Sequence, residues 1–314
     1  MKNSTKTFLL CTTAAVAGMY AYNRYISETS AEKNILDDKE GSYYEWKEGR
    51  IFYKTFGNGK PLLLVHDIDS AASSIEWQKV AKKLSMNHKV YTIDLIGCGR
   101  SDKPGISYTS YLYVQMLTAF IKDVIKEKTD VIASNLSCPS VLMANQLDGD
   151  IIDQIILINP VSLKQLELMP DDLSKFKKAI INTPILGTFI YNRMTTQEKI
   201  NLRFQKEFYA KSSHASATTK EAYYAAAHLD DGKGKYLFSS LLGNYMNQDI
   251  KHALKKIDRK VLILVSSEMP GAMAAVENYE KLNSQFESIH ISGSNKYPQL
   301  EVPDKVLKIL ENAL

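Results

Sequence analysis

The sequence predicts an α/β protein with a mostly parallel sheet of eight strands, flanked by helices and interrupted by a helical insertion. Two observations carry this prediction. Short apolar runs such as residues 62–65 and 261–265 are typical of strands buried on both faces. Segments with apolar residues at helical spacing alternate with these runs, and such alternation is the pattern of βαβ units.

The expected elements follow in chain order. A hairpin comes first, with strands at residues 43–46 and 50–54 that are joined at Glu48 and Gly49. Further strands are expected at 62–65, 90–93, 130–133, 155–158, 261–265 and 288–291, and helices at 74–86, 111–126, 138–145 and 304–314. We assign residues 42–160 and 251–314 to the core. Residues 161–250 have a helical pattern and should form a cap over the strand carboxyl ends, where ligands bind in such sheets.

Composition excludes several classes of protein. The 314 residues carry 39 basic and 35 acidic side chains, which gives a net charge of +4. A nucleic-acid-binding protein needs a concentrated basic face, so this balance predicts no nucleic-acid partner. Three cysteines and six histidines are scattered without metal-ligand spacing, and we predict neither a metal site nor a cofactor. The sequence does not decide whether Cys98 and Cys138 form a disulfide.

The N-terminus differs from the rest. Residues 7–23 contain no charge, follow Lys2 and Lys6, and end at Arg24. We expect residues 1–25 to be a membrane anchor, with residues 26–41 as a polar spacer; a cleaved signal peptide and an apolar helix lying on the domain are the alternatives. The lysines before the apolar stretch favour a domain on the outer side of the membrane.

Three motifs carry a resemblance to a known family. Residues 94–104, DLIGCGRSDKP, are similar to the D-x-x-G-x-G-x-S-x-x-P loop of the α/β-hydrolases. The Val65-His66 pair resembles the start of their H-G loop, and residues 300–303 resemble the segment after their catalytic histidine. From about Ile51 onward the chain therefore resembles the α/β-hydrolase family, which implies an eight-stranded sheet with a cap.

The resemblance also locates the catalytic positions, and all three are substituted. The family's nucleophile elbow, G-x-S-x-G, corresponds to residues 133–137, where Asn135 replaces the nucleophilic serine. Met269 stands at the position of the acid, with Glu268 one residue away. Lys296 stands where the family has its histidine. Because an amide nitrogen is not a nucleophile, the sequence predicts loss of triad catalysis.

The backbone of the oxyanion hole, the pair of N–H groups that binds the charged oxygen of the intermediate, survives side-chain substitution. Leu136 and Ile68 would supply these groups. The loop glycine of the family is replaced by Asp67, whose carboxylate would oppose oxyanion binding. We expect Lys296 to pair with either Glu268 or Asp67, because an unpaired buried lysine is costly. A solvent-reaching side chain is the alternative.

Three functions compete. The favoured one is a membrane-tethered protein without triad catalysis that binds a small apolar ligand or a protein partner. The second is an active ester hydrolase with displaced machinery, using Ser134 or Ser137 with His66. The third is a structural protein that uses the cap as its interface. A cleft that its own side chains have filled would favour the third over the first.

Overall fold

The sheet has eight strands and is mostly parallel, as predicted. The computed structural model describes residues 2–31, 35–36 and 40–314. The strand order is β1-β2-β4-β3-β5-β6-β7-β8, and only β2 runs antiparallel to its two neighbours, β1 and β4. The strands are β1 Ser42–Trp46, β2 Gly49–Phe56, β3 Lys60–Val65, β4 His88–Ile93, β5 Thr129–Ser134, β6 Ile152–Ile158, β7 Val261–Ser266 and β8 Phe286–Ile291.

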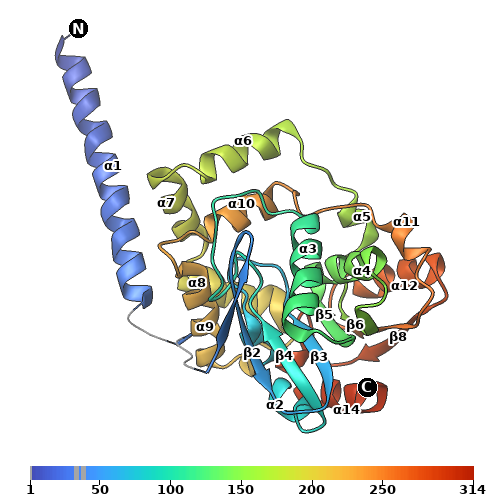
Figure 1. Cartoon of the computed structure of the whole chain (residues 1–314). Coiled ribbons are helices and arrows are strands. Elements are labelled where there is room, and N and C mark those ends of the chain that lie inside the picture. The colour runs from blue at the N-terminus through green and yellow to red at the C-terminus, as the bar shows by residue number, and fades with distance from the viewer. Residues whose placement is uncertain (1, 32–34, 37–39) are drawn as a thin grey trace.

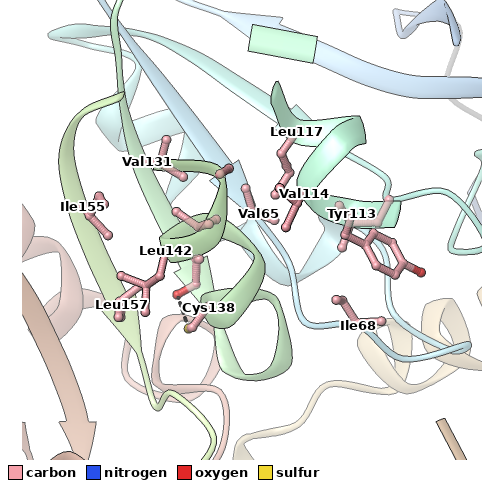
Figure 2. Close-up of a cluster of buried hydrophobic side chains, with 14 of the residues drawn as sticks. Val65, Ile68, Tyr113, Val114, Leu117, Val131, Cys138, Leu142, Ile155 and Leu157 are labelled. Carbon is pink, nitrogen blue, oxygen red and sulfur yellow. Dashed lines mark hydrogen bonds between the residues drawn. The ribbon is translucent and has the colours of Figure 1, made fainter. Parts of the chain in front are cut away.

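Helices cover both faces of this sheet (Figure 1). Helices α3 Ser110–Phe120, α4 Cys138–Leu147 and α12 Ala272–Leu282 pack on one face, and α2 Ala81–Leu84 and α14 Pro303–Ala313 pack on the other. Successive strand residues point to opposite faces, so Val65 joins the first core while Leu64 joins the second. Figure 2 shows Val65 and Val131 of the sheet facing Leu142 of α4 and Leu117 of α3.

Some helices differ from the expectation. Residues 74–86 form a 3-10 turn, Ser74–Trp77, followed by the short α2, because the N–H groups of Gln78 and Val80 bond to carbonyls three residues back. Helix α3 passes into a π-helical turn, Ile121–Ile125. Helix α12 was not predicted. A short helix, α13 Pro298–Glu301, precedes α14. Cys98 and Cys138 are buried free thiols, so they form no disulfide.

The chain between β6 and β7 is helical, and we keep the name cap for residues 161–250. Pro170 and Pro184 lie just before two of its helices, where proline ends one helix and permits another. The helices of this segment are α5 Leu163–Leu166, α6 Asp172–Ile181, α7 Ile185–Met194, α8 Gln197–Arg203, α9 Ala217–His228 and α10 Lys235–Leu242, and α11 Lys251–Leu254 follows.

Helix α1, Lys2–Ala31, extends further than the expected end near Arg24. Its second half packs against α7 and α9, where Tyr22 meets Phe189 at a ring distance of 5.3 Å and Asn23 donates to the Ile185 carbonyl. Its first half rises away from the domain (Figure 1). Within the described ranges, no helix combines the length and apolarity needed to cross a bilayer, so the predicted membrane-spanning anchor is not supported. Threonines and an asparagine dilute its apolar stretch.

Candidate functional site

The turn after β5 has the shape that the sequence predicted. Strand β5 ends at Ser134, Asn135 has φ +50°, and a 3-10 turn, Asn135–Ser137, leads directly into α4. Asparagine tolerates this left-handed conformation better than most residues with a side chain. Ser137 pins the turn, because its hydroxyl donates to the Ser134 carbonyl and accepts from the Ser134 N–H. The strand–turn–helix shape of an elbow is therefore present, with Asn135 in its tight turn.

The described hydrogen bonds of the Asn135 side chain all involve its Nδ2 atom. Its Nδ2 donates to the Ser134 hydroxyl at 2.8 Å and to the Lys296 carbonyl at 3.3 Å. Its Oδ1 is buried and accepts no hydrogen bond from the described residues. Since a buried acceptor without a donor is costly, this oxygen is available to accept a further hydrogen bond.

The Asp67 carboxylate accepts a hydrogen bond from one of the two backbone N–H groups expected to form the oxyanion hole. Its Oδ1 accepts the Leu136 N–H at 3.0 Å. Its Oδ2 accepts the Tyr297 hydroxyl at 2.8 Å and lies 2.7 Å from the Lys296 ammonium. The carboxylate is almost fully buried, and this ion pair with two hydrogen bonds compensates for its lost hydration. The Asp67 carboxylate thus takes up the Leu136 N–H, which the sequence analysis expected to serve an oxyanion hole.

The other expected site residues lie around this ion pair. Ile68 and Met269 line the same cleft, and Met269 also packs against the core. Glu268 does not reach Lys296: it is exposed and accepts the N–H groups of Gly293 and Ser294, which lowers the pKa of its carboxyl. Of the two partners proposed for Lys296, the structure selects Asp67.

His66 is placed as a structural residue. Its Nε2 accepts the Leu95 N–H at 3.0 Å, so the ring proton is on Nδ1, which donates to the Asp67 carbonyl at 2.6 Å. Burial lowers the pKa of the imidazole, which keeps it neutral. Among the described residues, neither Ser134 nor Ser137 forms a hydrogen bond with a histidine. A serine–histidine pair for a displaced hydrolase is therefore not assembled here.

Two buried polar residues near this site were not predicted from the sequence. Asn159 follows β6 with φ +47°; its Oδ1 accepts the Ser266 N–H, and its Nδ2 donates to the carbonyls of Asn295 and Lys296 at 3.1 Å each. This amide fixes the loop that carries Lys296 to the ends of two strands. The only signal in the sequence is an asparagine at a strand end, where positive φ is common.

The second is Glu76, which lies behind Asp67. One of its oxygens accepts the Asp67 N–H at 3.1 Å, and the other accepts from Gln299 at 2.8 Å. Burial, together with the negative charge of Asp67, raises the pKa of Glu76 to about 8. Glu76 is therefore protonated at neutral pH while Asp67 pairs with Lys296. Glutamate within a short amphipathic segment gave no sign of this burial.

A cleft of about 480 Å³ lies between the elbow and the cap. Its wall combines apolar side chains, amides, the Asp67–Lys296 pair and the charged residues Asp69, Lys206 and Glu207. The main apolar contributors are Val161, Leu241, Met246 and Met269, and the amides are Asn135, Gln165, Asn244, Asn247 and Asn295. The cleft is open and is not filled by its own side chains. In the described part of the chain, no three His, Cys, Asp or Glu side chains come together as metal ligands would.

Comparison with known proteins agrees with this architecture. A serine hydrolase of carbazole degradation superposes with a TM-score of 0.69 at 16% identity, over 87% of this chain and 97% of its own. A membrane phospholipase A, described as a bacterial virulence factor, gives 0.69 at 16% identity over 99% and 97%. The chain has the α/β-hydrolase fold.

Sequence matches are shorter. A 2-hydroxy-6-oxo-6-(2'-aminophenyl)hexa-2,4-dienoic acid hydrolase of Metapseudomonas resinovorans is 26% identical over 113 residues, which are 35% of this chain and 39% of that protein. An uncharacterised protein of Mycobacterium tuberculosis is 26% identical over 110 residues, 35% of this chain and 32% of the relative. The chain thus matches only about a third of the length of these relatives. No family model matches.

Proposed function

We propose that this protein is a non-hydrolytic member of the α/β-hydrolase fold that binds a small molecule in the cleft above Asn135. The observation that carries the proposal is the Asp67 carboxylate on the Leu136 N–H, clamped by Lys296 and Tyr297. A tetrahedral oxyanion would have to displace this anion and leave Lys296 with a new partner. Asn135 offers no nucleophile for the first step.

The cleft supports a ligand with an apolar body and at least one hydrogen-bond donor. Apolar side chains from the cap and from Met269 provide the body's surroundings. The unpaired Oδ1 of Asn135 provides the acceptor. An open cleft also favours ligand binding over a purely structural role for the cap, because its volume is large enough for a small ligand.

Catalysis is tested with 4-nitrophenyl butyrate and a serine-directed fluorophosphonate. We expect the wild-type protein to show no turnover above buffer and no phosphonate adduct in intact-mass spectrometry. Asn135→Ser should remain inactive, because Lys296 and Met269 stand at the positions of the base and the acid, and triad residues act as a unit. Turnover in the wild type that the phosphonate abolishes would overturn the proposal in favour of a displaced serine hydrolase.

Binding is tested with the fluorescent probe 1-anilinonaphthalene-8-sulfonate. Met269→Trp should fill the cleft and reduce the probe signal, whereas Met86→Trp, at an exposed position outside the cleft, should leave it unchanged. Equal signals from the two variants would show that the probe does not occupy the cleft.

We also propose that the first half of α1 attaches the protein to a membrane surface without crossing the bilayer. The described side chains from Thr5 to Gly18 are all exposed, and Phe8 is 73% exposed. The neighbouring phospholipase is itself described as a membrane protein. In cell fractionation, Phe8→Ser/Leu9→Ser/Leu10→Ser should move the full-length protein to the soluble fraction. An unchanged distribution would refute this attachment.

A further inference from the structure

Cap helix α6 exposes large apolar side chains and buries polar ones, which is the reverse of an ordinary surface helix. It exposes Leu173 and Phe176, at 57% and 63%, and leaves Ile180 half-buried; these residues share one face at i, i+3 and i+7. Its buried side holds the polar residues Ser174 and Lys178 together with Ile181 at its end. Water-soluble helices normally place these two kinds of residue the other way round, so the exposed face is suited to something other than water.

The polar side of α6 is firmly attached to the protein. The Lys178 ammonium donates to the Ser107 hydroxyl at 2.9 Å and lies 5.0 Å from the centre of the Tyr245 ring. Helix α6 also packs against α10 and α7. The helix therefore cannot simply turn its apolar residues inward without breaking these contacts. We call the exposed residues Leu168, Met169, Leu173 and Phe176, together with the half-buried Ile180, the outer apolar face.

Helix α6 lies on the same side of the molecule as the free end of α1. Helix α6 forms the upper edge of the domain in Figure 1, and the first half of α1 rises beyond it. Helix α7 connects the two, because it packs against α6 and holds α1 through Phe189 and Tyr22. One flat surface could thus receive both segments together.

Charge points to the nature of that surface. Residues 171–194, from the N-cap of α6 through α7, contain four cationic side chains and two carboxylates, those of Asp171 and Asp172, and so carry a net positive charge. Helix α1 contains three cationic side chains and one carboxylate, that of Glu28, which pairs with Arg24. An anionic lipid surface attracts such segments. A second copy of the same face would bring like charges together, which disfavours a symmetric contact.

We propose that the outer apolar face rests on an anionic phospholipid bilayer, with Leu173 and Phe176 at the boundary between headgroups and acyl chains. This inference rests on the membrane attachment proposed for α1 and adds a second contact to it. The two contacts together would fix the orientation of the cap toward the lipid.

The test uses the full chain and vesicles of phosphatidylcholine with or without phosphatidylserine, in a co-sedimentation assay. Leu173→Ser/Phe176→Ser should weaken binding to the phosphatidylserine vesicles by about tenfold or more, given the transfer free energy of two large apolar side chains. The matched control, Met86→Ser/Leu147→Ser, removes two other exposed apolar side chains, at 75% and 58%, and should bind like the wild type. Circular dichroism verifies that both variants fold.

The outcomes separate the two proposals. If the α6 variant binds as tightly as its control while the Phe8–Leu10 variant is released, the inference about α6 is wrong and attachment through α1 stands. If the wild type binds neither kind of vesicle, both fail. If vesicle binding is unchanged and the α6 variant instead loses a dimer seen in sedimentation velocity, the face is an interface between copies and the inference is overturned. Selective loss on phosphatidylserine vesicles supports it.

Discussion

Replacing Lys296 by methionine tests whether the Asp67 pair holds the site together. In Lys296→Met the Asp67 carboxylate loses a cation at 2.7 Å but keeps the Leu136 N–H and the Tyr297 hydroxyl. Methionine has nearly the same length, so the change removes charge with little loss of packing. The variant therefore isolates the electrostatic contribution of the ammonium.

The expected loss follows from burial. Removing one partner of a fully buried pair costs about 3–5 kcal/mol, because the remaining charge is left without compensation. The Lys296 side chain is 24% exposed, so water can partly replace the ammonium, and two hydrogen bonds to Asp67 remain. We therefore expect the free energy of unfolding to fall by about 2–3 kcal/mol. Adding Asp67→Asn should recover about half of that loss, since the two sites are coupled.

The measurement is urea unfolding at pH 7, followed by the fluorescence of the buried Trp77. The control is Lys260→Met, which removes the exposed pair with Glu287 at 3.2 Å and should cost less than about 1 kcal/mol. A Lys296→Met loss no larger than the control, or strictly additive effects in the double variant, would refute the view that this pair is a buried structural unit.

Three further predictions concern the same region. Glu76 keeps its proton up to about pH 8 in the folded state but only up to about pH 4.5 in the unfolded state. The free energy of unfolding should therefore fall as the pH rises between these values, by up to about 1.4 kcal/mol per pH unit. Glu76→Gln should flatten that slope in urea unfolding at pH 5, 6 and 7. His66→Ala should cost about 2–4 kcal/mol, and a fully stable variant would contradict the structural role. Asn135→Ala should lower the melting temperature through strain of about 1–2 kcal/mol at φ +50°, whereas Asn135→Gly should lower it less; equal losses would exclude a strained elbow.

The fold was predictable because its signals are local. Buried strands such as β3 and β7 are continuous apolar runs, and the loop at residues 94–104 is dense in glycine and polar residues at fixed spacing. Helix breaks were harder, because a 3-10 turn at Ser74–Trp77 depends on how the chain packs. The end of α1 was misplaced for a similar reason: its second half is stabilised by contacts with α7, which no local pattern records.

The site was predictable only where the backbone dictates the residue. The turn at Asn135 followed from small flanking residues and from asparagine's tolerance of positive φ. The choice between Glu268 and Asp67 as the partner of Lys296 depends on distances between loops, so the sequence left it open. The roles of Asn159 and Glu76 depend on burial from several elements, and such burial has no signature within a few residues of chain.

The substitutions around Asn135 form one interdependent set. The buried Asp67 carboxylate is compensated by the Lys296 ammonium beside it and by the Leu136 N–H that donates to it. Its charge in turn helps to keep Glu76 protonated behind it. A histidine at position 296 would give Asp67 a cation only when protonated, and a glycine at position 67 would leave Lys296 without its anion. The Asp67–Lys296 pair and the protonated Glu76 therefore depend on one another, so that changing one of these residues alone should cost more stability than changing it together with its partner.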